Sequence, residues 1–162
     1  MNKHQSLILI VDDNVQNLKV LGNTIKAEGW HLAVANSGQQ ALDFLKKKKP
    51  ALILLDIMMP EMDGYETCKR IKADPDLKEI PVIFLTAKND TESIVQGFNV
   101  GAVDYISKPF NAQELIKRVQ THLELVHSKQ EVIEKNEIHK ELLHVLCHDL
   151  SNPIGAILTS AE

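Results

Sequence analysis

Hydrophobic and polar positions form two alternating patterns along the first two thirds of the chain. Short, nearly continuous apolar runs occupy residues 7–11, 31–35, 51–56, 81–87 and 102–106. Between them, apolar residues recur three or four positions apart over residues 15–28, 37–49, 65–72 and 91–100. The first pattern is typical of strands buried on both faces, and the second is typical of amphipathic helices. The alternation therefore predicts an α/β fold, a doubly wound parallel sheet of five strands with helices on both faces.

A different pattern begins after Phe110. No glycine or proline occurs from there to Pro153, and apolar residues keep a spacing of three or four. These are Leu115, Val119, Leu123, Val126 and Ile133, followed after a phase slip by Ile138, Leu142 and Val145. We expect one helix from residue 111 to about 150, on the order of 60 Å long, with Asn111 as its cap and Glu114 completing a capping box.

The narrow apolar stripe on this long helix indicates how it is covered. A parallel coiled-coil dimer would bury such a stripe, and the phase slip would then be a stutter. We therefore predict a homodimer formed through the C-terminal helix. The alternative is a long helix that folds back on its own domain.

Composition narrows the class of protein. The chain has 162 residues, of which 44% are hydrophobic and 25% charged, as in a soluble globular protein with a core. Its formal net charge of -4 gives no sign of a nucleic-acid partner or an anionic membrane. No apolar run approaches the roughly 18 residues of a membrane span, and the N-terminal run is too short for a signal peptide. Cys68 and Cys147 lie far apart, as expected of reduced thiols, so we expect a cytoplasmic protein.

Polar residues follow four of the predicted strands. Asp12 and Asp13 follow the first strand, Asp56 ends the third, Thr86 ends the fourth and Lys108 follows the fifth. The carboxyl ends of parallel strands lie along one edge of a sheet, which is where open α/β sheets place their sites. We therefore expect these five side chains to converge.

Three clustered carboxylates suggest a cation and a nucleophile. Like charges at short range repel and raise one another's pKa, and one lysine leaves an excess of negative charge. Mg²⁺, a hard divalent ion with oxygen ligands, would balance it. A carboxylate can also attack phosphorus, and Mg²⁺, Lys108 and the Thr86 hydroxyl would neutralise and hold the transferred group. The pattern therefore predicts Mg²⁺-dependent self-phosphorylation at Asp56.

Four motifs carry a resemblance to a known family. They are IVDDN at 10–14, LLDIMMPEMDG at 54–64, FLTA at 84–87 and YISKPF at 105–110. In this order and spacing, residues 5 to about 125 resemble a two-component response-regulator receiver domain. The resemblance implies a flavodoxin-like strand order 2-1-3-4-5. It also implies a histidine kinase or a phosphotransfer protein as the phosphodonor.

The same resemblance implies a role for each matched residue. Asp56 would be the phospho-acceptor. Asp13 would bind Mg²⁺ directly, Asp12 mainly through water, and the backbone carbonyl of Met58 would be a further ligand. Thr86 and Lys108 would contact the phosphoryl group, Thr86 and Tyr105 would form the switch, and the Lys108–Pro109 peptide bond is usually cis in the family.

A second resemblance lies near the end of the chain. The sequence HDLSNP at 148–153 is similar to the H-box of dimerising histidine kinases. His148 would then accept phosphate, Asp149 would orient or deprotonate it, and Asn152 would occupy the phosphatase-assisting position. The alternatives are a solvated helix histidine and, for His144 with His148, a metal-binding pair.

The kinase resemblance is incomplete in this sequence. Histidine kinases continue with a second dimerisation helix and an ATP-binding domain, whereas this sequence reaches Glu162 within the first helix and has no glycine-rich nucleotide motif. We expect a fragment of a hybrid histidine kinase, the alternative being a separate ATPase protein. The expected parts are a receiver domain at 1–125, a coiled-coil linker helix at 126–143, and the first part of a dimerisation helix at 144–162.

The predicted function is phosphorelay signalling, in which the receiver regulates the dimeric helix that carries His148. The first alternative is the N-terminal part of an active ATP-dependent histidine kinase, and the second is a dimerising scaffold. A haloacid-dehalogenase-like phosphatase also uses an aspartate nucleophile. That family needs an Asp-x-Asp motif after its first strand, where this chain has Asp12, Asp13 and Asn14.

Overall fold

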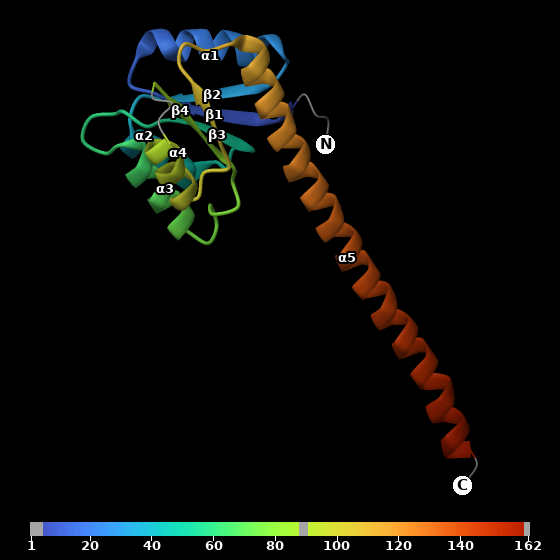
Figure 1. Ribbon diagram of the computed structural model, residues 1–162. Coiled ribbons are helices and arrows are strands. Elements are labelled where there is room, and N and C mark those ends of the chain that lie inside the picture. The colour runs from blue at the N-terminus through green and yellow to red at the C-terminus, as the bar shows by residue number, and fades with distance from the viewer. Residues whose placement is uncertain (1–4, 88–90, 161–162) are drawn as a thin grey trace. The chain divides into compact units, whose positions relative to one another are not determined.

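A computed structural model describes residues 5–87 and 91–160 of the chain, with side chains as far as residue 148 (Figure 1). Its internal contacts divide the chain into two units, Met1–Glu124 and Leu125–Glu162. The first unit holds the sheet and all of the shorter helices, and the second consists of the remainder of the last helix.

Five parallel strands form the sheet of the first unit. They are β1 (Leu7–Val11), β2 (His31–Ala35), β3 (Leu52–Asp56), β4 (Val82–Thr86) and β5 (Asp104–Ser107). Their order is β2-β1-β3-β4-β5, as predicted. The register pairs Val11 with Leu55 and Asp56 with Leu85, so β1, β3 and β4 end side by side. β3 and β4 are buried along their whole length because neighbouring strands and both helical layers cover them.

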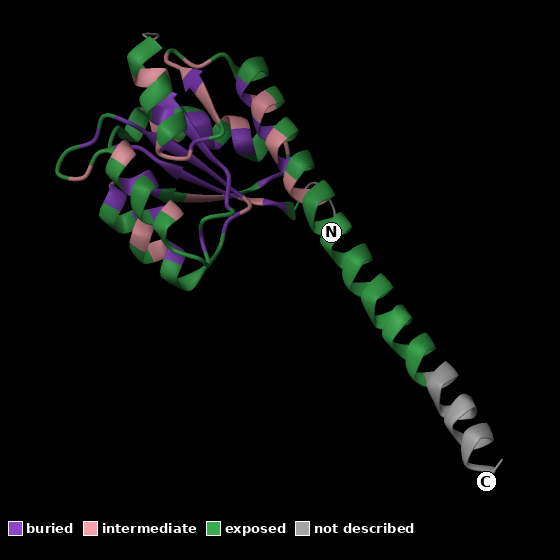
Figure 2. Ribbon diagram, turned by 60° about the horizontal axis from the view of Figure 1, so that its bottom comes forward, coloured by how far each residue is buried: buried purple, intermediate pink, exposed green. Residues whose placement is uncertain are grey.

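Helices cover both faces of the sheet. The helices are α1 (Val15–Ala27), α2 (Gly38–Lys47), α3 (Gly64–Ala73), α4 (Thr91–Asn99) and α5 (Ala112–Ser160). Leu21 of α1 and Val119 of α5 belong to the core on one face, whereas Leu45 of α2 and Ile71 of α3 belong to the core on the other. The doubly wound arrangement predicted from the hydrophobic pattern is confirmed (Figures 1 and 2).

Local polar contacts fix where helices begin near the ends of strands. The side chains of Asn14, Ser37 and Asp63 accept hydrogen bonds from the first free backbone N–H groups of α1, α2 and α3. At the start of α3, a Cβ on Gly64 would lie 2.3 Å from the carbonyl oxygen of Asp56. Only glycine allows α3 to begin this close to the end of β3.

One strand boundary differs from the prediction. The apolar run at 102–106 predicted a strand there, but β5 begins at Asp104. The N–H of Ala102 instead donates to the carbonyl of Gly97 and closes the end of α4 at 3.1 Å. Ala102 is buried in the core all the same. The apolar pattern therefore predicted the burial of Ala102 correctly but its secondary structure wrongly, since Ala102 lies in the loop before β5.

The last helix is continuous, as predicted, and extends past residue 150 to Ser160. Asn111 caps it through a 3.1 Å hydrogen bond from the N–H of Glu114. Leu115, Val119 and Leu123 are buried against the sheet of their own unit. The first part of the apolar stripe therefore belongs to the receiver-like core. Among the described residues, no helix is both long and apolar enough to cross a membrane.

Apart from the half-buried Val126 and His127, the part of α5 in the second unit is exposed along its described length (Figure 2). Its large exposed apolar side chains are Leu125, Val132, Ile133, Ile138, Leu142, Leu143, Val145 and Leu146. The predicted coiled coil would cover these side chains, and it stays a prediction.

Candidate functional site

Three carboxylates meet at the carboxyl edge of the sheet. Asp12 and Asp13 directly follow β1, and Asp56 is the last residue of β3. One oxygen from each lies within 4.8 Å of the other two. Asp12 is fully buried and Asp56 is 3% exposed, whereas Asp13 is exposed. Two buried carboxylates and one open to solvent form a set of hard oxygen donors that suits Mg²⁺.

Lys108 brings a positive charge to this cluster from the segment after β5. Its Nζ lies 3.0 Å from Oδ1 of Asp56 and 3.3 Å from Oδ2 of Asp12. Its backbone N–H donates to the carbonyl of Thr86 at 2.8 Å, and the Lys108–Pro109 peptide bond is cis. One ammonium group therefore contacts both buried carboxylates.

Asp56 has an elevated affinity for a proton. All its surroundings together raise its pKa from 3.8 to about 6, and burial is the largest cause, with the negative charge of Asp12 acting in the same direction. The hydrogen bond and charge of Lys108 and the N–H of Met58 act in the opposite direction. The sequence pointed to repulsion between carboxylates, but desolvation contributes more because the side chain lies at the end of a fully buried strand.

Thr86 and Tyr105, the two predicted switch residues, line one cavity together with Ile94 and Phe98. Thr86 is buried at the end of β4, next to the residue that pairs with Asp56. The Tyr105 ring is half-buried and meets the Phe98 ring edge-on, with 6.4 Å between centroids. The sheet thus brings Thr86 to the same edge as Asp56, with Tyr105 on the neighbouring strand.

The family model described as the response regulator receiver domain matches residues 8–120. The chain belongs to this family. Its members act in two-component signalling, take phosphoryl groups from a kinase or phosphotransfer protein, and generally use Mg²⁺ at a cluster of acidic residues. The acidic cluster of this receiver fits that ion.

Solved structures agree with the assignment. A putative response regulator from Chloroflexus aurantiacus is 37% identical, with a TM-score of 0.71 over 74% of this chain and 98% of that one. The receiver domain of a signal transduction histidine kinase from Syntrophus aciditrophicus is also 37% identical, with a TM-score of 0.69 over 74% of this chain and 90% of that one.

Curated relatives are longer proteins with different names. A probable cyclic di-GMP phosphodiesterase of Vibrio cholerae is 45% identical over 77% of this chain and 28% of its own length. The DNA-binding response regulator MtrA of Mycobacterium bovis is 40% identical over 76% of this chain and 53% of its own length. The chain therefore spans about half or less of these relatives. The DNA-binding name of MtrA conflicts with the predicted absence of a nucleic-acid partner.

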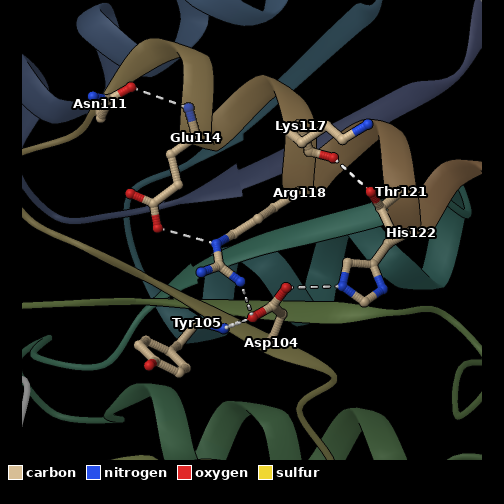
Figure 3. A network of polar contacts seen from close by, with 8 residues as sticks. All are labelled: Asp104, Tyr105, Asn111, Glu114, Lys117, Arg118, Thr121 and His122. Atoms are coloured by element: carbon tan, nitrogen blue, oxygen red, sulfur yellow. Dashed lines mark hydrogen bonds and ion pairs between the residues drawn. The ribbon is translucent and has the colours of Figure 1, made fainter.

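A polar network ties the start of α5 to β5 of the receiver (Figure 3). Asp104 accepts hydrogen bonds from Arg118 Nη1 at 2.7 Å and from the Tyr105 N–H at 2.9 Å, and it lies 3.0 Å from His122 Nε2. Burial acts to raise the pKa of Asp104, but the His122, Tyr105 and Arg118 contacts hold it below its usual value. The Arg118 guanidinium also lies 5.7 Å from the centre of the Tyr105 ring. Sequence reasoning missed this network, although Arg118 and His122 are one helical turn apart.

The sequence also did not single out the residues that hold Asp12. The N–H of Asn14 donates to Oδ1 of Asp12 at 2.9 Å, and the side-chain amide of Asn17 donates to Oδ2 at 3.1 Å. The signal that could have found them is their place in the first turn of the helix that follows Asp12.

Of the remaining predicted site residues, Met58 lies beside the cluster and His148 lies in the second unit. Met58 is exposed, and its N–H lies 3.4 Å from Oδ1 of Asp56. Its carbonyl as a metal ligand stays a prediction. His148 is exposed in the second unit. The side chains of Asp149 and Asn152 lie outside the described residues.

Proposed function

We propose that Asp56 is the phospho-acceptor of this receiver and that a histidine kinase or a phosphotransfer protein is the donor. The observation that carries the proposal is the buried Asp56 carboxylate, contacted by Lys108 Nζ at 3.0 Å and flanked by two further carboxylates. Carboxylates grouped in this way repel one another, and a bound cation would relieve that repulsion.

In the proposed reaction an Asp56 oxygen forms a bond to phosphorus while the bond from phosphorus to the donor breaks. The donor leaves with the electron pair of that bond, and the product is an acyl phosphate. From its position beside Asp56, the Lys108 ammonium group can contact the phosphoryl oxygens. The Thr86 hydroxyl can donate a hydrogen bond to them. Asp12, Asp13, Asp56 and the Met58 carbonyl would hold Mg²⁺, which supplies positive charge to those oxygens when bound.

The test is phosphorylation of the full chain by acetyl phosphate with Mg²⁺. Wild type should gain a hydroxylamine-sensitive phosphoryl group, located at Asp56 by mass spectrometry. Asp56→Asn should fold and gain none, and Asp43→Asn, an exposed aspartate elsewhere on the receiver, should behave as wild type. A hydroxylamine-sensitive phosphate retained at full yield in Asp56→Asn would show that the acceptor is another residue.

The second part of the proposed function is a response of α5. We propose that residues 1–125 act as the receiver, 126–143 as a coiled-coil linker, and 144–162 as the start of a dimerisation helix. The exposed apolar side chains between Leu125 and Leu146 support pairing with the same helix of a second copy. The Asp104–Arg118 contact, beside Tyr105, gives the switch a connection to the base of that helix.

This coupling is tested with single cysteines placed along residues 133–145, in a chain without Cys68 and Cys147. Disulfide yields between copies should differ with and without phosphodonor, because the helices should change register. A coupling free energy of roughly 1–3 kcal/mol is enough for a clear change. Identical profiles, with phosphorylation verified, would mean that the helix only joins the two copies.

A second candidate is part of an ATP-dependent histidine kinase. It is favoured by the sequence HDLSNP at 148–153 and by the likeness to a receiver domain of a histidine kinase. Incubation of the chain with ATP and the catalytic domain of a histidine kinase should then give alkali-stable phosphohistidine at His148, located by mass spectrometry, and His148→Gln should remove it. Phosphate confined to Asp56 would favour a regulated scaffold.

A further inference from the structure

The first turn of α1 forms a frame around Asp12. The Asn14 side chain caps the helix by accepting from the N–H groups of Gln16 and Asn17, while its own N–H donates to Asp12 Oδ1 at 2.9 Å. The same turn places the Asn17 amide 3.1 Å from Asp12 Oδ2. Both oxygens of this fully buried carboxylate are therefore held by one rigid segment.

Two donors of different kinds share Asp12 Oδ2. One is the neutral Asn17 amide, and the other is the Lys108 ammonium group at 3.3 Å. Lys108 also contacts Asp56, where the proposed function adds a phosphoryl group. When Lys108 follows that group, Asp12 loses a contact, and an unsatisfied buried carboxylate is costly. The Asn17 amide does not take part in the reaction, so it can keep its hydrogen bond to Asp12 Oδ2 throughout.

A neutral amide also suits a site that binds a cation. It fixes the orientation of the carboxylate without cancelling its charge, whereas a lysine or arginine at the same place would compete with the metal. Partners that orient a ligand in this way typically change metal affinity 10–100-fold when they are removed.

We propose that Asn17 is a positioning residue of the phosphorylation site. It holds Asp12 in the orientation that serves Mg²⁺ and keeps Oδ2 hydrogen-bonded when Lys108 moves to the phosphoryl group. The inference rests on the proposed function of Asp56.

The test compares the full chain with three variants. Asn17→Leu removes the donor at similar size, Asn17→Gln keeps an amide, and Gln16→Leu makes a matched change at an exposed neighbour on α1. Calorimetric titration with Mg²⁺ alone gives the affinity, and acetyl phosphate at saturating Mg²⁺ gives the phosphorylation rate. We expect Asn17→Leu to bind Mg²⁺ about tenfold more weakly and to react more slowly even at saturation. Asn17→Gln should lie between Asn17→Leu and wild type, and Gln16→Leu should match wild type.

Unfolding by urea separates positioning from stability. An Asn17→Leu variant that is less stable but binds Mg²⁺ as wild type does would overturn the proposal, as would an equal loss of affinity in Gln16→Leu. Failure of the proposed function looks different, since wild type would then bind Mg²⁺ without gaining phosphate. In that case the Mg²⁺ affinities would still decide the role of Asn17.

Discussion

Neutralising Asp56 should stabilise the metal-free receiver at neutral pH. The carboxylate is 3% exposed at the end of a buried strand, and burial, its largest perturbation, raises its pKa to about 6. The folded state therefore binds a proton at Asp56 more tightly than the unfolded state does. Stability is highest with Asp56 protonated and falls as the pH rises from about 3.8 to about 6. Asn has the same shape and stays neutral, so Asp56→Asn does not lose this stability as the pH rises.

The size of the effect follows from the shift. Each pKa unit corresponds to about 1.4 kcal/mol, so a shift from 3.8 to about 6 lowers the free energy of unfolding by about 3 kcal/mol at pH 7. Asp56→Asn also removes a partner of Lys108, which retains its contact with Asp12 Oδ2 at 3.3 Å. The shift already includes the opposing hydrogen bond and charge of Lys108, so the net gain should be about 3 kcal/mol or less.

The assay is urea unfolding of wild type and Asp56→Asn between pH 4 and 8 in excess chelator. The single tryptophan, Trp30, is 7% exposed and reports the core by its fluorescence. The difference between the proteins should be small at pH 4 and should reach its full value by about pH 7. Asp43→Asn, at an exposed position, should change stability by less than about 0.5 kcal/mol at any pH.

Two results would refute the reasoning. One is a difference between wild type and Asp56→Asn that does not vary with pH, and the other is a less stable Asp56→Asn at pH 7. Mg²⁺ provides a further check, because a ligand that binds only the folded state raises its stability. Wild type should gain more from Mg²⁺ than Asp56→Asn, because the variant has one fewer carboxylate in the site.

Three further predictions concern the metal, the helix and the loop after β3. Phosphorylation by acetyl phosphate should require Mg²⁺. Undiminished labelling in excess chelator would show that the reaction does not depend on the metal. Ile133→Lys and Leu142→Lys should dissociate the proposed dimer in light scattering, since each would bury an unpaired charge, whereas Ser128→Lys should leave it intact. A dimer that survives both substitutions would mean that the copies meet elsewhere. Gly64→Ala should destabilise the receiver by about 1–3 kcal/mol in urea unfolding, because its Cβ would lie 2.3 Å from a backbone oxygen. Unchanged stability would show that the loop relaxes freely.

Local pattern was sufficient to predict most of the fold, because each element has its own hydrophobic period. Five apolar runs predicted the parallel strands, and the long interval without glycine or proline predicted α5 as one helix. The boundary of β5 was wrong by two residues because Ala102 is buried by a loop contact that has no period in sequence. The stripe on α5 gave no means of separating Leu123, buried on its own sheet, from Ile133, which is exposed.

The candidate site, like the fold, could be predicted in part from the sequence. Which side chains gather could be predicted from the strand pattern, because strand ends in a parallel sheet share an edge, and Asp12, Asp56 and Lys108 each follow or end a strand. The contacts that hold these side chains could not be predicted, because they depend on how the elements pack in three dimensions. Burial as the main perturbation of Asp56 and the Asn17 amide on Asp12 depend on how deeply a strand is covered and where a helix begins above it. Those distances are set by packing between elements remote in sequence, and hydrophobic periodicity records only which face of each element is buried.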